Sequence, residues 1–135
     1  MKLSAGVIAL ILAVLITGAI FVFLFTETGL PVGVESSNST FSGNIEYEGD
    51  SRFHSIQVED NAIWMHCILN CGGSDFDLYG SFRVTPTTSS YDFQGYDVGG
   101  EDLYYENPQS GIWHLMVHSY EGIGHYDLIV VIEYS

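Results

Sequence analysis

From Phe41 onward the chain is a series of short runs rich in Ile, Val, Tyr, Phe and Trp, separated by turn sequences. The runs include "RFHSIQV", "NAIWMHCIL", "DFDLYGSFRV" and "GHYDLIVVIEY", and the turns include "CGGS", "DVGG" and "NPQSG". Short strands repeated at about 8–12 residues, with no helical period between them, are typical of a β-sandwich or barrel. We therefore predict an all-β, antiparallel domain of about eight strands over residues 41–135.

The run "GIWHLMVHSY" shows this alternation most clearly. Successive side chains of a strand point to opposite faces of the sheet. We expect one face of this strand to enter the core, namely that of Trp113, Leu115 and Val117. The opposite face carries His114, Met116 and His118.

Two carboxylates begin the run "GSDFDLYGSF". In a strand, Asp75, Asp77 and Tyr79 share one face, so the two acids lie close together. Calcium takes 6–8 oxygen ligands from carboxylates and loop carbonyls, and a Gly-Gly-Ser turn precedes this strand. One hypothesis is a calcium site at Asp75 and Asp77. The other is that the carboxylates accept hydrogen bonds from turn N–H groups and shield the strand end.

The two cysteines lie close together in "CILNC". A disulfide requires Cα atoms within about 7 Å, which four residues of straight strand exceed. A Cys67–Cys71 bond therefore requires the chain to turn by Asn70, and the following "CGG" permits such a turn. The sequence leaves two alternatives open, an internal disulfide and two buried thiols.

An uncharged apolar segment of 23 residues runs from Leu3 to Phe25. As a helix it would be roughly 34 Å long, enough to cross a bilayer core of about 30 Å. It is longer than the apolar core of a signal peptide. We predict a transmembrane signal-anchor helix over residues 1–25, inserted through residues 3–25. Lys2 precedes the span, which places the C-terminal domain outside the cell membrane by the positive-inside rule.

Residues 26–40 are rich in Gly, Ser and Thr, and we predict that they form an exposed polar stalk. Within them, Asn38-Ser39-Thr40 matches the acceptor pattern for N-glycosylation. The alternative is an unmodified loop.

The outer part of the chain is strongly acidic. All 17 Asp and Glu follow Phe25, where Arg52 and Arg83 are the basic residues, and the whole chain carries a net charge of −14. Such a surface repels nucleic acid and anionic lipid, so we predict no nucleic-acid partner. It favours cations, a basic partner or a salty medium, and the alternative is that the charge serves solubility alone.

The order of several elements resembles the bacterial pre-peptidase C-terminal (PPC) domain. The resemblance covers about residues 41–135 and is carried by Asp75–Tyr79, Glu101–Leu103, Pro108, Gly111–Trp113, Tyr120 and Gly122–Tyr126. It implies a β-sandwich of jelly-roll type that is not itself a catalyst and usually follows a secreted peptidase. Calcium in some related sandwiches adds support to the calcium hypothesis. Here a predicted membrane span precedes the domain, which argues against a role in peptidase maturation.

The sequence argues against an enzyme. It has no Gly-x-Ser-x-Gly nucleophile elbow, and Ser119 directly follows His118, so these neighbours on a strand would point to opposite faces. We predict a membrane-anchored, non-catalytic module for surface binding or adhesion, with a surface protein or glycan as ligand and self-assembly possible. The alternative is a pilin- or archaellin-like filament subunit with a β-sandwich head, processed after Gly6 so that it begins at Val7.

Overall fold

The computed structural model describes residues 14–16, 19–25 and 31–135. Two short strands, β1 (Val14–Ile16) and β2 (Ala19–Phe25), pair with each other, and β2 pairs with the next strand, β3. Within the described ranges no helix is long and apolar enough to span a membrane. Residues 1–13 and 17–18 of the predicted anchor lie outside the described residues, so the anchor stays a prediction. The processing point after Gly6, which belongs to the filament alternative, also lies outside them.

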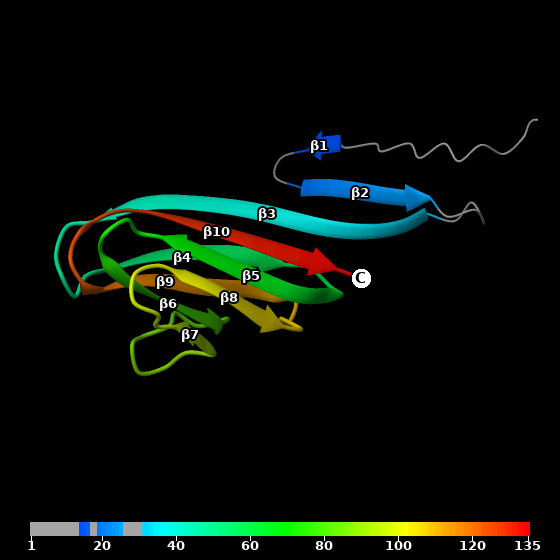
Figure 1. Cartoon of the computed structure of the whole chain (residues 1–135). Coiled ribbons are helices and arrows are strands. Elements are labelled where there is room, and N and C mark those ends of the chain that lie inside the picture. The colour runs from blue at the N-terminus through cyan, green and yellow to red at the C-terminus, as the bar shows by residue number, and fades with distance from the viewer. Residues whose placement is uncertain (1–13, 17–18, 26–30) are drawn as a thin grey trace, which may run out of the picture.

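Eight further strands form the body of the domain. They are β3 (Pro31–Ile45), β4 (Ser51–Val58), β5 (Ala62–Asn70), β6 (Asp75–Phe82), β7 (Phe93–Gly95), β8 (Glu101–Glu106), β9 (Gly111–Glu121) and β10 (Gly124–Tyr134). One sheet has the order β1-β2-β3-β10-β5-β8 and the other has the order β4-β9-β6-β7. All pairs are antiparallel, and Figure 1 shows the two sheets stacked as layers. The all-β prediction is confirmed.

β3 begins earlier than the predicted start of the domain at Phe41. Residues 35–40, which fall in the predicted stalk, pair with the last strand in the register Glu35↔Tyr134 to Thr40↔Ile129. The physical reason is that β10 needs partners for its backbone N–H and C=O groups along its whole length. Asn38 lies exposed on β3, opposite Val131. Its glycosylation stays a prediction.

The core between the sheets follows the predicted alternation. Trp113, Leu115 and Val117 on β9 are each at most 1% exposed. They pack with inward side chains of the other strands, including Ile56, Met65, Leu69, Phe76, Leu78, Tyr126, Leu128, Val130 and Ile132. Met116 departs from the prediction, because it lies on the outer face and is nevertheless buried. Its cross-strand neighbours, Tyr79 on β6 and Phe53 on β4, flank it on that face.

Four connections meet at one end of the molecule. The register shows this, because Ile45 at the end of β3 pairs with Gly124 at the start of β10, and Leu69 near the end of β5 pairs with Glu101 at the start of β8. Asp75 at the start of β6 likewise lies opposite the end of β9. In Figure 1 these turns form the left-hand end, and the C-terminus lies at the other. We call this the turn end.

Candidate functional site

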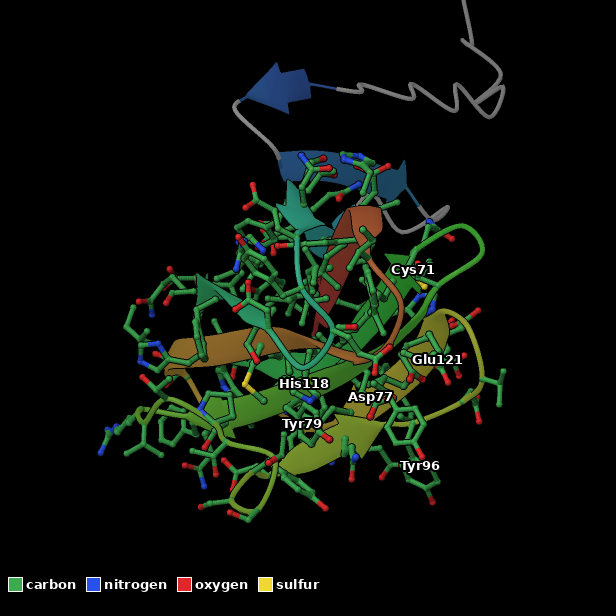
Figure 2. The ribbon with its side chains drawn as sticks, turned by 90° about the vertical axis from the view of Figure 1, so that its left-hand side faces the viewer. Cys71, Asp77, Tyr79, Tyr96, His118 and Glu121 are labelled. Atoms are coloured by element: carbon green, nitrogen blue, oxygen red, sulfur yellow. The ribbon has the colours of Figure 1, made fainter. Side chains whose placement is uncertain are left out.

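An open hollow of about 570 Å³ lies on the outer face of the four-stranded sheet, beside the turn end. It is lined by Asp75, Asp77, Tyr79, Gln94, Tyr96, Val98 and Tyr120, and we call it the Asp77 pocket. Figure 2 looks at the turn end and shows Asp77, Tyr79 and Tyr96 close together. The predicted pair of aspartates and Tyr79 therefore do share one face. The sequence did not identify Gln94 or Tyr96, which come from β7 and the loop after it.

Asp77 forms the floor of the pocket and is only 7% exposed. Among the described residues, its side chain has one hydrogen bond, donated by the Tyr79 hydroxyl over 3.4 Å. Gln94 Nε2 in turn donates to the Tyr79 hydroxyl oxygen at 2.9 Å, which leaves the Tyr79 proton for Asp77. Burial raises the pKa of Asp77, and the neighbouring charge of Asp75 raises it further. The Tyr79 hydroxyl therefore orients the Asp77 carboxylate, but no cationic side chain forms a hydrogen bond with it among the described residues.

Asp75 has a structural task as well. Its Oδ1 accepts a hydrogen bond from the backbone N–H of Gly99 at 3.0 Å, which ties β6 to the β7–β8 loop. This contact agrees with the strand-end hypothesis.

The side chains at this site fit calcium poorly. Among the described residues, no three His, Cys, Asp or Glu side chains are placed to hold a metal together. Asp75 and Asp77 alone supply fewer oxygens than the 6–8 that calcium takes. Calcium binding stays a prediction, and it would require several oxygens from backbone or water.

Exposed aromatic and apolar groups form the rim of the pocket. Tyr96 is 74% exposed and Tyr120 is 68% exposed. Val98 also lines the pocket, and its side chain is almost completely exposed to solvent. Exposed tyrosines suit ligand contact, because a large ring gives much contact area for few rotatable bonds. The pocket therefore combines a buried, charged floor with an exposed aromatic rim.

Glu101 is a second buried acid at the turn end, and it was not predicted as a functional residue. It is 4% exposed, and its Oε2 accepts a hydrogen bond from the backbone N–H of Asp97 at 3.3 Å. Its Oε1 has no hydrogen-bond partner among the described residues. Burial raises the pKa of Glu101 to about 7. Glu101 alternates along β8 with Leu103 and Tyr105, which pack against the core. This alternation is the sequence signal from which an inward-facing Glu101 could have been predicted.

Two serine–histidine pairs lie across the same outer face. Ser51 Oγ and His118 Nδ1 are 2.9 Å apart, and Ser55 Oγ and His114 Nδ1 are 3.0 Å apart. A hydrolytic triad needs a carboxylate bonded to the second imidazole nitrogen and an oxyanion hole. Among the described residues, no carboxylate forms a hydrogen bond with either of these histidines. The pairs therefore do not form a complete Ser-His-Asp triad among the described residues.

The cysteines are both buried, and both thiols are free. β5 continues as a strand from Cys67 to Asn70, and an extended chain keeps the two cysteines apart. The disulfide alternative stays a prediction. The Cys71 thiol lies 3.1 Å from the carbonyl oxygen of Ser74 and 3.0 Å from that of Gly99. The alternative of two buried thiols therefore agrees with the structure.

Comparison with known proteins adds information on the fold alone. The sequence matches no protein-family model and no curated protein. Among solved structures, it is similar to PliG of Aeromonas hydrophila, a periplasmic lysozyme inhibitor of g-type lysozyme. The two chains are 14% identical, the match covers 72% of this chain and 85% of that chain, and the TM-score is 0.50. The arrangement of two antiparallel sheets is therefore one that a periplasmic inhibitor protein also uses.

Proposed function

We propose that this chain is a non-catalytic binding module on the outer side of a cell membrane, and that the Asp77 pocket is its ligand site. The observation that carries the proposal is the pairing of a nearly buried carboxylate with the exposed rings of Tyr96 and Tyr120 around one hollow. Exposed rings around a fixed polar floor are typical of binding surfaces, in which aromatic anchors contribute much of the affinity.

We infer further that the sandwich is of jelly-roll type. The strand orders β3-β10-β5-β8 and β4-β9-β6-β7 support this, since each sheet alternates strands from the two halves of the chain. Such an order arises when two Greek keys fold together into a double sheet. This arrangement leaves the outer face of the smaller sheet accessible for a ligand.

A binding role agrees with the chemistry of the pocket better than hydrolysis does. The serines on the outer face are bonded to His114 and His118, which have no carboxylate hydrogen-bond partner within the part of the chain that the structure describes. The similar fold of PliG, a lysozyme inhibitor and not an enzyme by its description, supports a non-catalytic role. It also supports a location outside the cytoplasm, as PliG is periplasmic.

Binding is best tested with the full chain in lipid nanodiscs against a panel of soluble probes. The panel contains a basic protein, an acidic protein and neutral oligosaccharides, and binding is measured by biolayer interferometry. We expect at least one probe to bind, and a Tyr96→Ala/Tyr120→Ala variant to lose about tenfold or more in affinity. Tyr104→Ala is the matched control, because Tyr104 is 64% exposed but lies on β8 in the other sheet. If no probe binds, or if the control variant loses as much, the pocket is not a ligand site.

Membrane display is tested by fractionation of cells that express the full chain. We expect the protein in the membrane pellet, resistant to carbonate and to high salt, because 23 uncharged residues favour insertion. Extraction by salt would contradict the anchor.

The mature N-terminus separates the anchor from the filament alternative. We expect Met1 or Lys2 to begin the mature protein. A mature chain that begins at Val7 would favour the pilin- or archaellin-like subunit instead.

A further inference from the structure

We propose that the Asp77 pocket binds a cationic side chain, an arginine or a lysine on the surface of a basic partner protein. This inference rests on the proposed function and names the chemistry of its ligand. The cation would lie between the carboxylates of Asp75 and Asp77 and the rings of Tyr96 and Tyr120.

The first argument is the unbalanced charge of the pocket floor. Asp77 is 93% buried and receives a single long hydrogen bond from Tyr79 among the described residues. A buried carboxylate is normally paired with a cation or held by several short hydrogen bonds. A bound ammonium or guanidinium group would supply the missing partner.

The second argument is that the described part of the chain has no cation of its own to offer. Arg52 is bonded to Asp50 over 2.6 Å, and Arg83 lies over the ring of Phe82 at 4.8 Å from its centre. Neither arginine lines the pocket, and no lysine occurs in the described ranges. His118 lies opposite Asp77 in the β6–β9 register, but its Nδ1 contacts Ser51 Oγ and it does not line the pocket. A cation that fills the pocket would therefore come from another molecule.

The third argument is that the aromatic rim of the Asp77 pocket suits a cationic side chain. A cation positioned over the face of an aromatic ring is attracted by the negative face of the ring, and an arginine also stacks on it. Tyr96 and Tyr120 offer two such rings, and Val98 offers an apolar contact for the methylene stem of a long side chain. A neutral sugar would use the rings but would leave the carboxylates unbalanced.

The fourth argument is the long-range electrostatic field of this acidic chain. The chain carries a net charge of −14, and Glu121 and Asp75 line a second hollow that adjoins the pocket through Val98. Such a concentration of negative charge attracts a basic protein and accelerates its association. The open shape of the pocket suits a side chain presented on a protein surface.

The inference is tested by NMR titration of the isotope-labelled full chain in nanodiscs. The probes are a short Gly/Ser peptide with one central arginine and the same peptide with citrulline in its place. Citrulline has nearly the same shape as arginine but carries no charge. We expect the arginine peptide to shift the resonances of Asp77, Tyr79, Gln94 and Tyr96, and the citrulline peptide to bind about tenfold more weakly.

Two isosteric variants provide the matched comparison. Asp77→Asn removes the pocket charge, and we expect about a tenfold loss of affinity for the arginine peptide. Asp102→Asn removes an exposed charge on the other sheet, and we expect less than about a twofold loss.

A third variant tests the aromatic rim. Tyr96→Ala, at an exposed position where folding is not at risk, should weaken binding of the arginine peptide by about two- to fivefold.

Several outcomes would overturn the inference. Equal binding of the two peptides would show that charge is not recognised. Equal losses in Asp77→Asn and Asp102→Asn would show a general field effect and no pocket. Shifts of the same resonances by calcium alone, with no response to the arginine peptide, would assign the pocket to a metal. If an oligosaccharide of the panel binds through the tyrosines while the arginine peptide does not, the proposed function stands and this inference fails.

Discussion

The outer faces of the two sheets carry the same kinds of side chain and arrange them in opposite ways. On the larger sheet, Asp102 and His66 lie 2.6 Å apart across β8 and β5, and Tyr104 stacks on that histidine with ring centres 3.9 Å apart. Asp127 likewise contacts His125 at 3.2 Å. Each of these acids is exposed and has a basic partner.

On the outer face of the smaller sheet, His114 and His118 contact serines, and among the described residues Asp77 forms no hydrogen bond with a basic side chain. His118 lies opposite Asp77 in the β6–β9 register, but its Nδ1 contacts Ser51 Oγ. Asp77 is also far more buried than Asp102, whose side chain is 70% exposed. The comparison shows that faces of similar composition can differ in charge pairing. The acids on the outer face of the larger sheet pair with histidines, whereas Asp77 on the smaller sheet does not, and we call the latter the unsatisfied face. We take the unsatisfied face to be the one that binds.

The largest expected effect concerns β7, the edge strand that contributes Gln94 to the Asp77 pocket. A methyl group at Gly80 would overlap the ring of Phe93, which holds β7 in place, so we expect Gly80→Ala to lower the free energy of unfolding by about 1–3 kcal/mol. Chemical denaturation measures this change. Gly73→Ala is the control, because nothing lies within 4 Å of a Cβ there, and its effect should be small. Equal effects would show that β7 is not packed as described.

The next largest effect tests whether Glu101, like Asp77, carries a buried charge that destabilises the folded state. Its pKa is raised above the unfolded value of 4.5 to about 7, so the folded state binds more protons between these values. The contribution of Glu101 to stability is therefore fully present below about pH 4.5 and is lost as the pH rises through about 7. Glu101→Gln mimics the protonated form, and we expect it to raise the free energy of unfolding at about pH 8 by about 1–2 kcal/mol, after water has relaxed around the charge. At about pH 4 the variant should match the wild type. A constant difference across pH would contradict titration of Glu101.

A smaller effect compares the two faces directly. Burial and then Asp75 raise the pKa of Asp77, so its charge opposes folding as the pH rises above the usual value of 3.8. We expect Asp77→Asn to stabilise the chain slightly near neutral pH, by up to about 1 kcal/mol. Asp102→Asn removes a hydrogen-bonded partner of His66, and we expect a slight loss of about 0.2–1 kcal/mol. Thermal unfolding of both variants checks the signs, and two changes of the same sign would remove the contrast between the faces.

The smallest effect is that of divalent metal. Asp75 and Asp77 supply only two carboxylates, so we expect calcium to raise the melting temperature by a few degrees over chelator, and magnesium by less, because magnesium demands stricter octahedral geometry. Asp77→Asn should remove the difference between the two ions. Equal shifts by calcium and magnesium would indicate charge screening alone.

Local patterns were enough to predict most of the strands and the direction of their side chains. Trp113, Leu115 and Val117 enter the core as expected, and Asp75, Asp77 and Tyr79 share the outer face. These predictions succeed because the two-residue period of a strand is a local property of the backbone. The start of the domain was harder to predict, since the Ser- and Thr-rich beginning of β3 becomes a strand by pairing with β10, far away in the sequence.

The sequence by itself determined an acidic, all-β chain with two aspartates on one face of a strand. Only the tertiary structure decided that Asp77 is buried, because its cover comes from side chains such as Gln94 and Tyr96, which approach it when β7 pairs with β6. It also decided that Glu101 is buried against the β7–β8 loop, where Oε2 accepts the Asp97 N–H and Oε1 has no partner in the described part of the chain. The physical reason is that burial and charge balance depend on neighbours distant in sequence, whereas alternation depends on the strand itself.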